Sequence, residues 1–150
     1  MKKFLCLGIL MVTLSTSIFA QKNWNFRVGL LSPIPVNVQS SNNVSLGSTL
    51  FEVSYKASKN VSLMANSGYL RFNDFTNVPV LVGARYFVNS NLYFGASAGV
   101  AIFNEGDNQV MYTPHVGYQK GHVSLDAHYI DWRKTDDSYN NMALCLSYTL

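Results

Sequence analysis

The amino-acid sequence predicts an all-β protein, an eight-stranded antiparallel up-and-down transmembrane β-barrel, because one strand pattern recurs along the chain behind an export signal. The clearest strand is residues 91–104, NLYFGASAGVAIFN, in which every second residue from Leu92 to Ile102 is apolar. Its other face, from Tyr93 to Phe103, is small, partly polar and uncharged. A soluble sandwich strand usually has a charged or strongly polar outer face, whereas this stretch has about the 9–11 residues with which a tilted strand crosses a bilayer. The pattern therefore indicates a membrane strand.

Residues 1–20 have the pattern of a secretory signal peptide. A basic start at Lys2 and Lys3 precedes a short apolar run, and Ala20 is the small residue that a signal peptidase requires. An uncleaved membrane anchor is the alternative, but the apolar run is too short for a helical span and no charged stop follows. We expect cleavage after Ala20, which leaves 21–150 as one domain by length.

Removal of the signal peptide changes the charge balance of the chain. Lys+Arg falls from 11 to 9 against 8 acidic residues, so the formal net charge falls from +3 to +1. This balance gives no support for nucleic-acid binding. Only Cys145 of the two cysteines remains, so no internal disulfide is expected. No phosphate loop or dinucleotide fingerprint occurs, and we expect no cofactor.

The other strands follow the same alternation, separated by turn-forming residues. Their apolar faces run over Trp24 to Leu30, Phe51 to Tyr55, Val61 to Ala65, Val80 to Val88, Val110 to Tyr118, Val123 to Tyr129 and Met142 to Leu150. The third strand is the least regular, because alternation slips near Ser67 and Gly68. A glycine bulge there would reverse the facing of Tyr69 to Phe72.

The connections alternate between short and long. The short turns are expected at residues 57–60, 89–91 and 120–122, and the longer links at residues 35–48, 73–77, 104–109 and 133–141. Outer-membrane barrels have short periplasmic turns and longer outside loops. The pattern therefore predicts that both ends of the barrel domain are periplasmic.

The inner face of the predicted barrel is polar. It includes four charged residues and two histidines, namely Arg27, Glu52, Arg85, Asp126, His115 and His128. We expect opposite charges to pair inside, Arg27 with Glu52 and Arg85 with Asp126, because an unpaired charge in a narrow interior is costly. An eight-stranded barrel is just wide enough for side chains to fill. A filled lumen is therefore favoured over an open channel.

Aromatic residues near strand ends provide a second indication of a membrane. An amphipathic ring suits the headgroup level of a bilayer. The residues expected at this interface, all on the apolar face, are Trp24, Tyr55, Tyr86, Tyr118, Tyr129 and Tyr148. The alternative is that these rings form the ordinary core of a soluble β-sandwich.

The strand texture, as in LYFGASAGVAIF and PHVGYQKGHVSLDAHY, resembles that of small outer-membrane β-barrel proteins of Gram-negative bacteria. The resemblance is to the OmpA transmembrane domain and OmpX-like group, the outer-membrane protein beta-barrel domain family, and covers residues 23–150. It implies contact with outer-membrane lipid and insertion by the barrel-assembly machinery. The family's insertion signal ends in an aromatic residue with a glycine upstream, where this chain has Leu150 and Cys145.

Some barrels of this size modify lipids, and such enzymes need a histidine with a serine near the outer leaflet. His122-Val123-Ser124 has these residue types, but the predicted topology places it at the periplasmic turn. Asp126 and His128 could hydrogen-bond inside, joined by His115. Polar filling of the lumen is the simpler explanation, so we expect no catalytic residue. A metal site on the two histidines lacks a third ligand, and none is expected.

Two non-enzymatic roles remain open from the sequence. A surface adhesin or ligand-binding barrel would use loops 35–48, 104–109 and 133–141, of which the last two contain acidic residues that could favour cations or basic partners. A structural barrel would occupy and stabilise the outer membrane without a specific ligand. The sequence does not separate these two roles.

Overall fold

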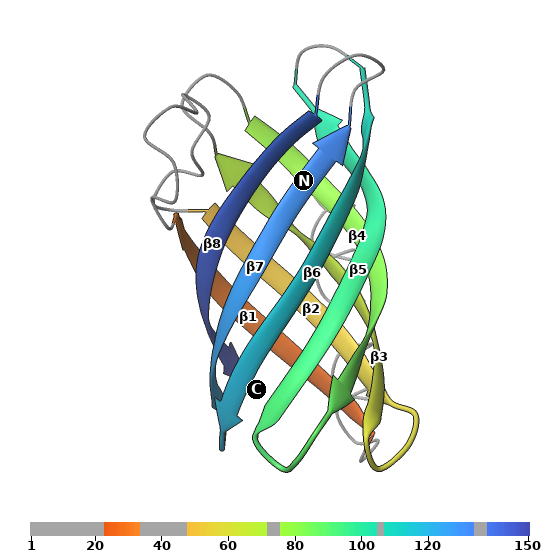
Figure 1. Ribbon diagram of the computed structural model, residues 1–150, viewed down its shortest axis with the longest axis vertical. Helices are drawn as coiled ribbons and strands as arrows, with labels where there is room; N and C mark the ends of the chain where they lie inside the picture. Colours follow the sequence, from red (N-terminus) through yellow and green to blue (C-terminus); the bar gives the residue numbers. More distant parts are fainter. Residues whose placement is uncertain (1–22, 34–47, 72–75, 105–106, 134–137) are drawn as a thin grey trace, which may run out of the picture.

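The computed structural model describes residues 23–33, 48–71, 76–104, 107–133 and 138–150, and these residues form one closed barrel. Every strand lies antiparallel to its sequence neighbours, and β8 pairs with β1 to close the sheet (Figure 1). The strands are β1 (Trp24–Pro33), β2 (Ser48–Lys56), β3 (Val61–Arg71), β4 (Thr76–Phe87), β5 (Leu92–Phe103), β6 (Gln109–Lys120), β7 (Val123–Arg133) and β8 (Ser138–Thr149). The predicted eight-stranded up-and-down topology is confirmed. Within the described ranges the chain forms no helix with the length and apolar character of a membrane span.

Side chains alternate across the sheet as the sequence pattern predicts. In β5, Phe94 is 53% exposed on the outer face, whereas the neighbouring Tyr93 is fully buried inside. The same alternation makes the outer surface apolar on all eight strands, with exposed residues such as Leu30, Leu63 and Val82. A continuous apolar surface of this kind suits contact with lipid hydrocarbon.

The suggested bulge in β3 does not occur, so that hypothesis is wrong. Ser67 pairs with Val80 and Leu70 pairs with Asn77 in one unbroken register. Tyr69 points outward at 44% exposure and Leu70 points inward at 1%. A Cβ at Gly68 would collide with the carbonyl oxygen of Thr49 on β2. The glycine is therefore needed for close strand approach and does not change the facing.

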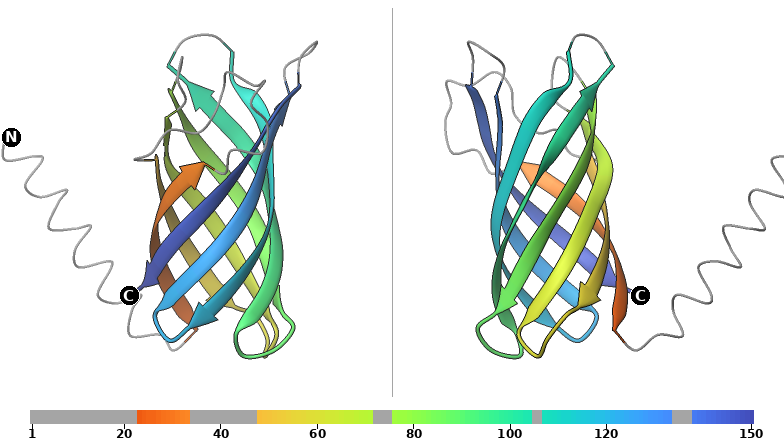
Figure 2. Two further views of the ribbon diagram at one scale, coloured as in Figure 1. Left: turned by 60° about the vertical axis from the view of Figure 1, so that its left-hand side comes forward. Right: turned by 90° about the vertical axis from the view of Figure 1, so that its right-hand side faces the viewer.

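The short turns all lie at one end of the barrel, which we call the turn end (Figure 2). The first two turns are closed by backbone hydrogen bonds, from Ala57 to Val61 at 3.0 Å and from Val88 to Leu92 at 2.9 Å. The third contains Gly121, whose φ of 62° is the left-handed conformation that glycine adopts most readily. The described chain starts and ends at the same end.

The strand ends that border the long connections lie at the opposite end, which we call the loop end (Figure 1). Most of the predicted links 35–48, 73–77, 104–109 and 133–141 fall outside the described residues, as does the predicted signal peptide 1–20. The strands extend further into these links than predicted. Residues inside strands that the sequence analysis assigned to links are Ser48, Thr76, Asn77, Gln109, Arg133 and 138–141.

The barrel interior has two chemically different halves. Toward the loop end the interior is mainly apolar, although Ser48, Asn77 and Asn141 are also buried there. We call the buried apolar group the apolar plug, and it is made of Leu31, Leu70, Leu81, Ala101, Met111, Ile130, Trp132, Ala143 and Cys145. Leu50 and Phe103 pack against it. Toward the turn end the interior is polar and contains the buried charges. The predicted polar, paired filling therefore describes the turn-end half, whereas apolar side chains make up most of the other half.

Candidate functional site

A charged network crosses the turn-end half of the lumen. Arg27 on β1 lies directly opposite Glu52 on β2, and its Nε is 3.9 Å from Glu52 Oε1. Arg85 on β4 donates from Nη2 to Glu52 Oε2 at 2.6 Å. Arg85 and Glu52 are both only 4% exposed. Glu52 therefore lies between two guanidinium groups and forms an ion pair with each of them.

Asp126 on β7 completes the network from the other wall. Arg27 donates from Nη1 to Asp126 Oδ2 at 3.4 Å and to the hydroxyl oxygen of Tyr93 at 2.9 Å. The Tyr93 hydroxyl donates in turn to Asp126 Oδ1. The other Arg27 amino group donates to Gln119 Oε1 at 3.1 Å. The two acidic and two basic residues balance one another in charge.

The predicted pair of Arg85 and Asp126 does not form. Arg85 is paired with Glu52 instead, and Tyr93 lies between Arg85 and Asp126. The Arg85 guanidinium lies over the Tyr93 ring, 4.5 Å from its centroid, while the Tyr93 hydroxyl bonds Asp126. The alternating pattern of β5 places Tyr93 on the inner face but does not indicate its role. An aromatic residue on a face otherwise rich in glycine was the available signal.

Two glycines make room for these large side chains. A Cβ at Gly117 would lie 2.5 Å from Tyr93 Cζ and would collide with the Asp126 carboxylate opposite it on β7. A Cβ at Gly95 would lie 2.6 Å from Nε2 of His115. The glycine texture of β5 and β6 is therefore a packing requirement of the network.

The two predicted lumen histidines lie against each other. His115 pairs with His128 across β6 and β7, and the rings stack with centroids 4.9 Å apart. His115 Nδ1 lies 3.2 Å from the Thr113 carbonyl oxygen, whereas its Nε2 has no hydrogen-bond partner among the described residues. The Asp126 oxygens accept from Tyr93, Arg27 and Ser147. The suggested hydrogen bond between Asp126 and His128 does not form among the described residues, although the two side chains lie close together.

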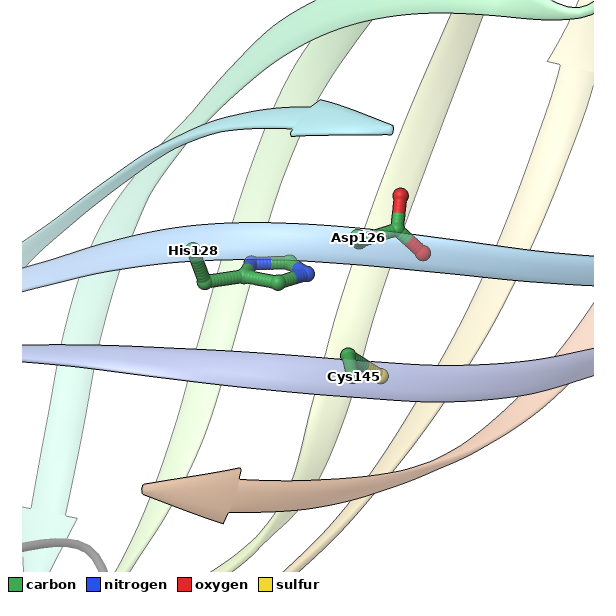
Figure 3. A group of neighbouring side chains, drawn as sticks. All are labelled: Asp126, His128 and Cys145. Atoms are coloured by element: carbon green, nitrogen blue, oxygen red, sulfur yellow. The ribbon is translucent and has the colours of Figure 1, made fainter. Parts of the chain in front are cut away.

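Asp126, His128 and Cys145 form a compact group of donor atoms (Figure 3). Cys145 lies opposite Asp126 in the pairing of β7 with β8, and one ligand atom from each of the three residues lies within 4.8 Å of the others. Sulfur, nitrogen and carboxylate donors suit zinc. The Arg27 guanidinium already occupies the carboxylate, so a cation would have to compete with it. The absence of a resident metal stays a prediction.

The histidine and serine at the last turn do not form a catalytic pair. The ring of His122 stacks on Tyr148, with centroids 5.6 Å apart, and donates from Nδ1 to the Thr149 carbonyl oxygen at 2.8 Å. The Ser124 hydroxyl lies inside, 2.8 Å from the Ser147 hydroxyl, and Ser124 is 1% exposed. Both side chains therefore have structural partners.

A cavity of about 400 Å³ lies between the charged network and the turn end. We call it the vestibule. Its lining is polar and basic, and consists of Asn25, Arg27, Ser54, Lys56, Lys59, Ser62, Arg85, Phe87, Asn89, Ser90, Gln119 and Thr149. A void of about 10 Å³ lies beside the apolar plug in the other half of the lumen. The vestibule is the larger of these two spaces and opens toward the turn end.

The predicted interface aromatics are all exposed on the outer face. Five of them lie near the turn end, where Trp24 packs on Tyr55 with ring centroids 5.1 Å apart. Tyr129 differs, because it is the seventh residue of the 11-residue strand β7 and lies near its middle. Tyr69 and Tyr112, which the sequence analysis did not assign, are exposed near the loop end. The rings thus mark both rims of the apolar surface.

Comparison with known proteins identifies the fold. No family model matches the chain, and no curated protein does. A solved structure of a de novo designed transmembrane β-barrel is similar, with a TM-score of 0.58, 15% identity, and coverage of 87% of this chain and 98% of that one. The Yersinia pestis outer membrane protein Ail in a phospholipid bilayer nanodisc is similar with a TM-score of 0.60 and 13% identity, and the match covers 87% of this chain and 100% of Ail. The crystal structure of Ail, the attachment invasion locus protein of Yersinia pestis, is similar with a TM-score of 0.55 and 10% identity, and the match again covers 87% of this chain and 100% of Ail.

These similarities, with the apolar outer surface and the closed strand order, define the class of protein. The chain has the fold of a small eight-stranded transmembrane β-barrel of the kind found in outer membranes. The resemblance expected from the strand texture is confirmed at the level of the fold.

Proposed function

We propose that this protein is a non-conducting structural barrel of the outer membrane, exported with a signal peptide that is cleaved after Ala20. The observation that carries the proposal is the filled lumen. The apolar plug occupies the loop-end half, and the network of Arg27, Glu52, Arg85, Tyr93 and Asp126 crosses the turn-end half. A solute would have to displace both to pass through the barrel.

A non-catalytic role is part of the proposal. The side chains that could take part in catalysis, Cys145, His128 and Asp126, are buried in the lumen, and the barrel wall separates them from lipid. His122 and Ser124 are bound to different backbone and side-chain partners. These arrangements favour polar filling of the lumen over a lipid-modifying site. Insertion would use the barrel-assembly machinery, with outer-membrane lipid as the surrounding partner.

Conductance measurements test the filled lumen. The purified protein in planar bilayers should give no steady current, and Arg85→Ala should not create stable steps. A variant that shortens the apolar plug, Met111→Ala with Trp132→Ala, is the comparison for an opened lumen. Stable single-channel steps from the unaltered protein, with a selectivity that Arg85→Ala changes, would assign it to the porins instead.

Surface binding is the second candidate function, since two of the similar structures are of Ail, the attachment invasion locus protein of Yersinia pestis. In this chain the contact would come from loops 35–48, 104–109 and 133–141. Replacing only the parts of these loops outside the strands, residues 35–47, 105–108 and 134–137, by short glycine–serine linkers should leave the barrel folded. Loss of adhesion to host cells in such variants would support binding, and unchanged adhesion would exclude it.

A further inference from the structure

We propose that the vestibule is a binding site for a small soluble phosphate-bearing anion that enters from the turn end. This inference goes beyond the structural role and does not depend on it, because the cavity would bind a ligand whether or not the barrel conducts. Its volume of about 400 Å³ lies within the range of roughly 300–1,000 Å³ that is usual for small-molecule sites.

The charge of the vestibule favours an anion. Four cationic side chains line it, Arg27, Lys56, Lys59 and Arg85, and no carboxylate does among the described lining residues. The two arginines are balanced by Glu52 and Asp126 in the network behind the cavity. Lys56 and Lys59 have no ion-pair partner in the described part of the chain. Four cations against two carboxylates leave an excess of two positive charges, which matches a dianionic phosphate group.

Two buried polar atoms without a hydrogen-bond partner belong to residues of the same wall. Arg85 bonds Glu52 through Nη2, while its Nε has no partner among the described residues. The hydroxyl of Thr149 also lacks one. Both residues are at least nine-tenths buried and both line the vestibule. Buried polar groups are normally paired, and guanidinium groups suit phosphate oxygens because their donors form a planar fork.

The shape of the lumen determines the direction of entry. The charged network and the apolar plug close the cavity on its loop-end side, so a ligand reaches it only past Lys56, Lys59 and Ser90 at the turn end. These lysines are exposed at the mouth and would attract an anion before it reaches the arginines. The enclosing strands separate the cavity from the surrounding lipid, which favours a soluble phosphate compound over a lipid headgroup.

The test is a calorimetric titration of the full barrel in phosphatidylcholine nanodiscs with inorganic pyrophosphate. We expect saturable binding of one pyrophosphate per barrel, weakened by added salt. The double variant Lys56→Gln/Lys59→Gln should bind about three- to tenfold more weakly, as expected for the loss of two exposed charges. Thr149→Val removes only a hydroxyl and should also weaken binding while the barrel stays folded.

Lys120→Gln is the matched control, because Lys120 is exposed at the same end but does not line the vestibule. It should leave the affinity unchanged. Absence of saturable binding, or an equal loss of affinity in Lys120→Gln, would overturn the proposal. Nanodiscs with phosphatidylglycerol separate the two phosphate sources. If the affinity for pyrophosphate is the same in both lipids, the ligand is a soluble phosphate compound. If phosphatidylglycerol lowers the affinity of the unaltered barrel but not that of the double lysine variant, a lipid headgroup occupies the same phosphate site.

Discussion

Removing the negative charge of Glu52 should destabilise the barrel strongly. Glu52→Gln keeps the side-chain shape but leaves Arg27 and Arg85 with Asp126 as their only nearby carboxylate. At an effective dielectric constant of about 20, a charge pair at 4 Å is worth about 4 kcal/mol. Glu52 has contacts of 2.6 Å and 3.9 Å with the two arginines. We expect a loss of about 3–5 kcal/mol in the free energy of unfolding, the usual result of breaking a buried pair.

The second variant restores the charge balance. Glu52→Gln with Arg85→Met leaves one arginine and one carboxylate, Arg27 and Asp126, still bonded. Replacing both members of a buried pair is often nearly neutral, so the double variant should be more stable than Glu52→Gln alone. Arg85 lines the vestibule, so water there can hydrate it in the Glu52→Gln variant. The loss in the free energy of unfolding of this single variant should therefore lie toward the lower limit of the expected range.

Equilibrium unfolding in urea, with the barrel in lipid vesicles, measures these differences. Tryptophan fluorescence reports on both halves of the barrel, because Trp132 is buried in the apolar plug and Trp24 is exposed near the turn end. Lys120→Gln, which removes an exposed charge, should change stability by less than about 0.5 kcal/mol. A double variant as unstable as Glu52→Gln would refute the charge-balance argument.

Other variants test the facing and packing of single residues. On a Cys145→Ser background, a cysteine at Phe94 should react with a lipid-soluble label and one at Ser97 should react poorly, because they lie on opposite faces of β5; reversed labelling would show the register to be wrong. Ala98→Lys, on the outer face near the middle of β5, should cost about 2–4 kcal/mol in vesicle unfolding measurements, and a negligible cost would contradict its contact with lipid. Gly117→Ala should cost about 1–3 kcal/mol by overpacking Tyr93; wild-type stability would mean that the network has spare room.

The sequence predicted the strands and their facing because alternation reports directly on a sheet with one apolar face. Of the two predicted charge pairs, Arg27 with Glu52 is present and Arg85 with Asp126 is wrong. Alternation places Arg27, Glu52, Arg85 and Asp126 inside, but the choice of partner depends on relative strand height and on the side chains between them. Tyr93 keeps Arg85 and Asp126 apart, because its hydroxyl bonds Asp126 and its ring lies against the Arg85 guanidinium.

The apolar plug escaped prediction for a different reason. Residues such as Leu81 and Met111 lie on the inner face of strands whose outer face is also apolar, so both faces have similar hydropathy. A period-2 pattern carries no signal where the two faces are alike. The vestibule was equally hidden, since its lining comes from six strands and two turns that only barrel closure brings together.

The charged network also determines when in assembly the barrel becomes complete. Its contacts join residues far apart in the chain: Arg27 and Asp126 are separated by 99 positions, Arg27 and Tyr93 by 66, and Arg85 and Glu52 by 33. In an open sheet Asp126 would be without the strand that carries Arg27, and its charge would remain in water or face lipid at high cost. Pairing of β8 with β1 ends that exposure in one step. The contacts of Arg27 with Asp126 and Tyr93 therefore depend on closure of the seam, whereas Arg85 and Glu52 lie on β4 and β2, which are already joined through β3 in an open sheet.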